Sequence, residues 1–150
     1  MVDIEATIAA FATIANAGKA TTGIAIAYPN SPASLTTTPA ICYFVGPQTY
    51  QPFQDSEDVK LESTTVYVRL HEAPITTGIP GEVEDRIKAR MSLIRDELLA
   101  YPSLNGLNFI KRAVLISSTG IKPMTYAGEN FAGCEWRMVV ERVLPVTYAE

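Results

Sequence analysis

The chain has 150 residues, the length of one domain, and residues 1–150 are expected to fold as a single domain. Apolar residues make up 47% of the sequence and charged residues 19%. This balance is typical of a folded globule and excludes a largely disordered chain. The formal net charge of −4 excludes a global basic field that would attract nucleic acid or an anionic membrane.

The N-terminal segment, residues 1–19, is apolar but does not have the charge pattern of a signal peptide. Asp3 and Glu5 stand where such a peptide carries positive charge. No run of about 18 uninterrupted apolar residues occurs, so no membrane span is expected. The sequence predicts a protein that is made and used in the cytoplasm without contact with a membrane.

Cys42 and Cys134 are the only cysteines, and each lies in an apolar, strand-like stretch. Two buried free thiols are favoured, with a disulfide between them as the alternative. Neither arrangement requires an oxidising compartment.

Two segments have the apolar periodicity of helices that pack one face on a sheet. The first is predicted over residues 3–17, where the apolar positions are Ile4, Ile8, Phe11 and Ile14. The second is predicted over about 81–101, where they are Val83, Ile87, Met91, Ile94, Leu98 and Tyr101. Pro102 prevents the second helix from continuing.

The remaining segments alternate between strand-like and turn-like composition. Strands are predicted over 24–28, 40–45, 59–75, 108–119 and 130–148, and irregular loops over 29–39, 46–58 and 120–133. In the third strand Val66 and Val68 face one way, and Arg69 and His71 face the other. The order αβββαββ predicts an α+β fold: a mostly antiparallel sheet of four to five strands packed by two helices.

The last ribbon, "NFAGCEWRMVVERVLPVTY" at 130–148, is long and two-sided. Its apolar side carries Cys134, Trp136, Met138 and Val140, and its charged side carries Glu135, Arg137 and Glu141. Pro145 cannot donate a ladder hydrogen bond, which places that end of the ribbon at a sheet edge or a bulge. A strand tryptophan in this pattern is most often a core residue. The alternative is that Trp136 anchors a contact with a neighbouring subunit.

No constellation of residues predicts a reaction centre. His71 is the single histidine, no GxSxG elbow is present, and we expect His71 to lie partly exposed on a polar strand face. The "DSED" at 55–58 lacks the pattern of an EF-hand loop, and the glycines of 120–133 match no phosphate-binding motif. We therefore expect no catalytic, cofactor-binding or metal-binding residues.

Four stretches in order carry a resemblance to a known family: "AICYFVGPQTYQP", "TTVYVRLHEAP", "EVEDRIKARMSLIRDELLAYPSLNGL" and "GIKPMTYAGENFAGCEWRMVVERVLPVTY". This pattern resembles the tail terminator, or tail completion, proteins of long-tailed, lambda-like bacteriophages. The last stretch is the most specific part. Head–tail joining and neck ring proteins have similar size and patterning and are the nearest alternative.

The resemblance implies a structural subunit that forms a homohexameric ring. Such a ring caps the tail tube protein, ends its polymerisation and joins the tail to head connector or neck proteins, and DNA passes through its lumen. It implies no enzymatic activity and no cofactor. The implied location is the head-proximal end of the virion tail, after assembly in the host cytoplasm.

A ring subunit must present two different surfaces to its neighbours. One hypothesis is that the charged side of the last ribbon pairs across subunits; its candidate interface residues are Glu135, Arg137, Glu141, Arg142 and Trp136. Plain solvent exposure of those charges is the alternative. A hypothesis from a different class is a small cytoplasmic enzyme or ligand-binding domain with its site at His71 and residues 120–133. A DNA-binding module is disfavoured by the acidic balance.

Overall fold

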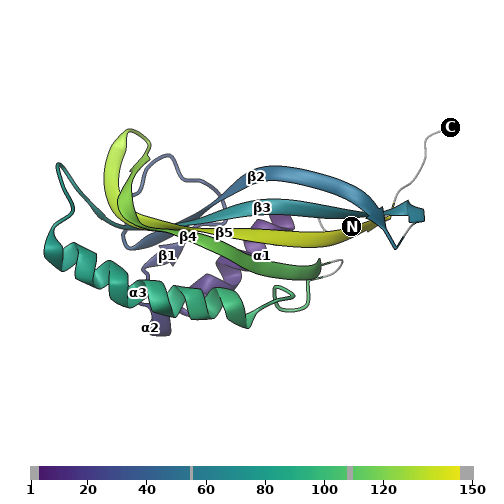
Figure 1. Cartoon of the computed structure of the whole chain (residues 1–150). Coiled ribbons are helices and arrows are strands. Elements are labelled where there is room, and N and C mark those ends of the chain that lie inside the picture. The colour runs from purple at the N-terminus through teal and green to yellow at the C-terminus, as the bar shows by residue number, and fades with distance from the viewer. Residues whose placement is uncertain (1–3, 55, 108–109, 146–150) are drawn as a thin grey trace.

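The computed structural model describes residues 4–54, 56–107 and 110–145, and it shows a five-stranded sheet with two long helices on one face (Figure 1). The elements are α1 (Ile4–Ala17), α2 (Lys19–Thr22), β1 (Ile26–Ala27), β2 (Ala40–Phe53), β3 (Ser56–Pro74), α3 (Gly81–Ala100), β4 (Ile110–Tyr126) and β5 (Glu129–Pro145). The predicted α+β class and the order αβββαββ are confirmed, with the one-turn α2 as an addition.

The strands are arranged in the order β1-β2-β3-β5-β4. β1 pairs with β2 in parallel over two residues, and all other pairs are antiparallel. β5 therefore lies inside the sheet, while β4 forms one edge. Figure 1 shows that the sheet continues well past the ends of both long helices. We call this projecting part the arm and define it as residues 46–53, 56–64 and 140–145.

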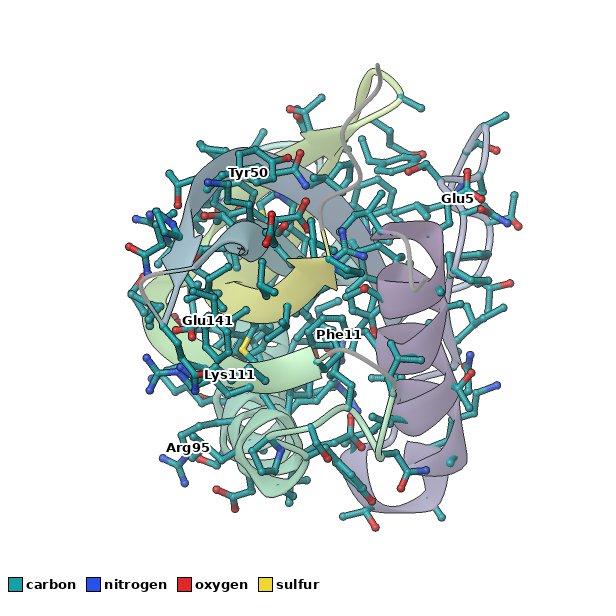
Figure 2. The ribbon with its side chains drawn as sticks, turned by 90° about the vertical axis from the view of Figure 1, so that its right-hand side faces the viewer. Glu5, Phe11, Tyr50, Arg95, Lys111 and Glu141 are labelled. Carbon is teal, nitrogen blue, oxygen red and sulfur yellow. The ribbon has the colours of Figure 1, made fainter. Side chains whose placement is uncertain are left out.

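The core lies between the sheet and the two long helices, on what we call the helix-covered face. Alternate residues of β3 and β5 point into it, among them Val68 and Trp136, which face each other across the two strands. Phe11 of α1 points from the helix toward the sheet (Figure 2) and stacks on Tyr43 with ring centroids 5.7 Å apart. α3 contributes Ile87, which is fully buried. The predicted apolar stripes of both helices and of β5 are thus confirmed, except for Tyr101, which lies past the end of α3 and is 39% exposed.

A buried ion pair ties α3 to β3 and α2. Glu72 lies at a β-bulge of β3, and its side chain is 1% exposed. Arg90 of α3 donates two hydrogen bonds to its carboxylate, from Nε to Oε2 at 2.7 Å and from Nη2 to Oε1 at 2.8 Å. The same guanidinium donates from Nη1 to the carbonyl oxygen of Thr22 at 2.6 Å. Because a planar guanidinium presents several donors in a fixed geometry, a single side chain joins three elements.

The predicted loop at 46–58 is wrong: the chain there forms the outer part of β2 and the start of β3, with residue 55 outside the described part. Pro47 and Pro52 lie in a stretch of β2 that pairs only with β3 among the described strands. A missing backbone donor can be accommodated at such an edge. A shift of register between Val45 and Gln48 accommodates the Gly46–Pro47 pair.

The predicted loop at 120–133 is also wrong, because β4 and β5 continue through it as a hairpin. Only Ala127 and Gly128 form the turn, with φ values of 50° and 79°. Pro123 lies on the sheet-edge strand β4, and Gly120 lies where the β4–β5 register shifts. The glycines and the proline that suggested a loop are therefore features of the strands and their bulges.

The other predicted bounds agree closely with the structure. The first helix spans Ile4–Ala17, the second spans Gly81–Ala100, and the last ribbon spans Glu129–Pro145. The strand predicted at 24–28 is reduced to two residues. Residues 3, 108–109 and 146–148 of the predicted elements lie outside the described part of the chain. Pro145 pairs with Val59 of β3, and no residue of the described part of β4 pairs with it. This agrees with the expected edge position.

Candidate functional surfaces

The sheet face opposite the helices, here called the open face, carries the charged side of β5. Glu135 accepts a hydrogen bond from Arg69 Nε of β3 at 2.5 Å. The Arg69 guanidinium also lies over the Phe44 ring, 4.5 Å from its centroid. The charge of Glu135 is therefore paired inside the chain, by a cation that is held in place on a neighbouring strand.

Glu141 is likewise paired within the chain. Its carboxylate lies 2.7 Å from Arg112 Nη2 and 3.9 Å from Lys111 Nζ, both on β4, and its side chain is only 11% exposed. Figure 2 shows Glu141 and Lys111 together on the side of the sheet away from α1. Each of these two acids of β5 is therefore paired with a cation on a neighbouring strand: Glu135 with β3 and Glu141 with β4.

Arg142 does not belong to the charged side to which the sequence assigned it. Even-numbered residues of β5 from Cys134 to Val140 point to the helix-covered face, and the β3–β5 ladder runs without a shift through Arg142. Arg142 pairs there with Glu62, directly opposite on β3, through a contact from Nε of 2.7 Å and a second from Nη2. Each side chain is 5% exposed. The placement was wrong because Glu141 and Arg142 are adjacent, and adjacent strand residues point to opposite faces.

Arg137 and Trp136 complete the predicted interface set. Arg137 is exposed on the open face and forms no ion pair within the described part of the chain. Trp136 is 2% exposed, which confirms it as a core residue. Cross-subunit pairing by the charged side stays a prediction, and it is now centred on Arg137.

His71 lies at the other end of the open face, inside an aromatic cluster. It is 1% exposed, and its ring meets Tyr126 and Phe131 edge-on, with centroids 5.6 and 5.5 Å away. Leu35, from the loop before β2, belongs to the same buried cluster as these two rings, and Tyr126 donates a hydrogen bond to the Pro32 carbonyl oxygen. The expectation of a partly exposed His71 was wrong, because that loop and the β4–β5 hairpin cover the strand.

The surroundings of His71 keep it neutral. Burial, together with the positive charge of Arg69, lowers the pKa of His71 from 6.5 to about 4. Its Nδ1 has no hydrogen-bond partner in the described structure. The fold does bring His71 next to residues 120–133, as the enzyme or ligand-binding hypothesis requires. The enclosing rings, however, leave almost none of His71 accessible to a substrate.

Both cysteines are buried free thiols, as the sequence favoured. Cys42 lies on the open face under the Leu35 cluster, and Cys134 lies on the helix-covered face. Burial raises the pKa of Cys42 to about 11 and also raises the pKa of Cys134. Thiols that remain protonated are poor nucleophiles and poor metal ligands.

A small enclosed space lies between α1, α3 and the sheet. It amounts to about 10 Å³, room for about one water, and Phe11, Tyr43 and Leu104 are among its lining residues. The carboxylate of Glu97 enters it and lies against Gly18, where a Cβ would come within 2.1 Å of Glu97 Oε2. Burial raises the pKa of the Glu97 carboxyl from 4.5 to about 7. The sequence analysis missed Glu97, although it occupies an inward position of α3, three residues after Ile94.

Glu97 makes the stability of the protein depend on pH. Its raised pKa means that the folded chain holds a proton between about pH 4.5 and 7 that the unfolded chain has lost, so stability falls as pH rises through that window. Glu97→Gln removes this dependence. Glu97 is only half buried, so solvent screens its charge and reduces the free energy that corresponds to the pKa shift. We expect the variant to be more stable than the wild type by on the order of 1–2 kcal/mol at pH 7.5, and by little at pH 4.5.

Chemical unfolding of both proteins at several pH values measures this difference. The opposite contribution of His71, whose lowered pKa costs stability as pH falls below 6.5, is common to both proteins and cancels. A difference in unfolding free energy that stays constant from pH 4.5 to 7.5 contradicts the prediction.

A groove of about 460 Å³ runs between α3 and the edge strand β4. Its nine lining residues are Lys88, Met91, Ser92, Arg95, Leu115, Ile116, Ser117, Ser118 and Trp136. Two of them are cations, and none is acidic. Ile116 is 52% exposed on the rim, and Trp136 forms part of the floor. The consecutive apolar residues 114–116 break strand alternation and are the signal by which the sequence indicates an irregular, outward-facing position here.

Within the described part of the chain, no group of three or more histidine, cysteine, aspartate or glutamate side chains is placed to hold a metal ion. None of the described helices combines the length and the apolar character that crossing a membrane demands. The features that stand out are surfaces: the open face, the arm and the groove.

Comparison with known proteins adds no relative. Neither a scan against protein-family models nor a search of the curated proteins finds a match for this chain. The geometry of the surfaces and the pattern of the sequence are therefore the basis on which a function is proposed.

Proposed function

We propose that this chain is a structural subunit of a bacteriophage tail, a tail terminator that assembles into a homohexameric ring. The ring caps the tail tube protein, ends its polymerisation and joins the tail to the head connector, with DNA passing through the lumen. The subunit acts through surface shape and charge and makes no covalent bonds. It works at the head-proximal end of the tail after assembly in the host cytoplasm.

The observation that carries this proposal is the arm. A sheet that continues past both of its helices exposes long strand surfaces that the chain itself does not cover (Figure 1). Residues 47–52 of β2 are all exposed, and Tyr50 is 58% exposed. A projecting element of this kind, together with a groove on a different edge, supplies the two unlike surfaces that a head-to-tail ring contact needs.

The α+β order that the resemblance implied supports the same assignment. The burial of His71 leaves the proposed site of the enzyme hypothesis with little access for a substrate, which favours the structural role. The open face adds Arg137, an exposed cation next to paired charges, which is the kind of group that fixes register between neighbouring subunits.

Electron microscopy of particles assembled without this protein tests the proposal. Because nothing would then stop the tube, we expect tails of variable and excessive length that are not attached to heads. Tails of normal length beside unattached heads would indicate a neck ring protein. Normal tails attached to heads would show that the chain has neither role.

A further inference from the structure

The groove between α3 and β4 combines an apolar lining with two cations. Its lining includes the apolar residues Trp136, Met91 and Leu115. The cations Lys88 and Arg95 also line it. Both cations contact an acid on the same helix, at 3.6 Å for Lys88–Glu84 and 2.9 Å for Arg95–Asp96. These pairs are exposed to solvent and weakly held, so both cations stay available to an incoming acidic group.

The arm has the complementary chemistry. Tyr50 projects from it with 58% of its surface exposed, and Asp58 of β3, in the same arm, is also exposed. Tyrosine is among the residues most enriched where protein interfaces gain their binding energy. An exposed aromatic side chain with a carboxylate on the same arm suits an apolar groove lined by two cations.

A chain cannot fill its own groove with its own arm. Tyr50 lies on β2, and the groove lies beside β4 on the far edge of the sheet, with β3 and β5 between them. Figure 2, which looks along the sheet from the arm end, shows Tyr50 at the top over β2 and Arg95 at the bottom on α3. The two surfaces face different neighbours, which is the geometry of a head-to-tail contact.

Edge-to-edge strand addition is a weaker explanation for these surfaces. The β4–β5 ladder contains three shifts of register, and β2 carries two prolines in its exposed part. Bulges and prolines of this kind prevent a further strand from pairing with a sheet edge. Side chains rather than a backbone ladder are therefore suited to carry the contact.

We propose that the arm of one copy docks into the α3–β4 groove of the next, with Tyr50 seated against Ile116 and Trp136. The exposed Asp58 of the arm then lies near Lys88 and Arg95. This contact rests on the proposed ring function and specifies its subunit interface. Repeated around an axis, it joins two unlike surfaces of each copy and closes the ring.

Substitution of Tyr50 tests the contact. Tyr50→Ala removes an exposed side chain, so we expect it to fold normally by circular dichroism. We expect it to raise the protein concentration needed for half-assembly by roughly 30-fold, the effect of losing one interface anchor. Leu99→Ala is the matched control, because Leu99 is also 58% exposed but lies outside the groove. Light scattering, with tail tubes present to nucleate the ring, measures assembly. Equal assembly of the two variants would overturn the contact.

Disulfide trapping gives a second, independent readout. A Tyr50→Cys chain mixed with a Ser117→Cys chain is expected to form a covalent heterodimer under mild oxidation. Thr49→Cys with Ser117→Cys is the control, since Thr49 points to the other side of β2. The native thiols are buried and do not interfere.

The outcomes separate the contact from the function. Rings that form without the Tyr50–Ser117 cross-link overturn the arm–groove contact and leave the ring function standing. A cross-linked closed oligomer, found together with normal tails in particles that lack the protein, supports the contact and removes the tail terminator role. A wild type that stays monomeric even with tail tubes present overturns both.

Discussion

Gly133→Ala is expected to destabilise the protein by about 3 kcal/mol or more, because an added methyl group would meet fixed backbone. Gly133 lies in β5 opposite His71, where β3 approaches at a bulge. A Cβ at this position would lie 1.8 Å from the carbonyl oxygen of Leu70 and 2.7 Å from Met124 Cε. The methionine can move, but the Leu70 carbonyl belongs to the central ladder and cannot move without breaking it.

Thermal unfolding of Gly133→Ala against the wild type measures this effect. For a chain of this size, a loss of 3 kcal/mol corresponds to a decrease in Tm of about 10 °C. Gly78→Ala is the control, because a Cβ there meets nothing within 4 Å. If Gly133→Ala unfolds within about 1 °C of Gly78→Ala, β3 and β5 do not approach each other as closely as the structure shows.

Arg90→Met is expected to cost about 3 kcal/mol, because it leaves the Glu72 carboxylate buried without its main partner. Glu72 is 1% exposed, and the remaining cation, Arg86, is 3.6 Å away on a half-exposed side chain. The carbonyl oxygen of Thr22 also loses its donor. The effect is a penalty for an unpaired charge, and it does not measure the net value of the ion pair.

A double-mutant cycle separates the two quantities. Adding Glu72→Gln to Arg90→Met removes the buried charge, so we expect the double variant to recover part of the loss in urea unfolding. Arg95→Met, which breaks the exposed Arg95–Asp96 pair, is the control and should change stability by less than about 0.5 kcal/mol. An Arg90→Met variant as stable as Arg95→Met is the result that would contradict the prediction.

The two long helices were predictable because their signal is local. The apolar spacing in α1 and α3 places Phe11 and Ile87 on one face of a helix, whatever that face packs against. Strand alternation was equally informative in β3 and β5, where Val68 and Trp136 were assigned to the buried side and lie there. These patterns depend only on residues within a few positions of each other.

The two misassigned loops show where local signals end. Pro47, Pro52 and Pro123 suggest irregular structure unless it is known that their strands pair on one side only. Which side of a strand is open depends on the order of the whole sheet. The β2–β3 and β4–β5 hairpins therefore became visible only in the folded chain.

The candidate site residues divide in the same way. The alternation of β5 placed Glu135, Arg137 and Glu141 on one face, and their shared face is real. It did not indicate that Arg69 and Arg112 neutralise two of them, because those partners come from other strands. The burial of His71 also has a distant cause, the loop that carries Leu35.

By itself, the amino-acid sequence determined the α+β class, the order of the elements, and which side of each helix and of the last strand is apolar. It could do so because these properties follow from the periods of the helix and the strand. Only the tertiary structure decided that β5 lies inside the sheet and that Tyr50 and the groove lie at different edges of it. The physical reason is that strand order and charge pairing depend on contacts between residues that are far apart in the chain. The free energies of these contacts exist only once the chain has folded and brought those residues together.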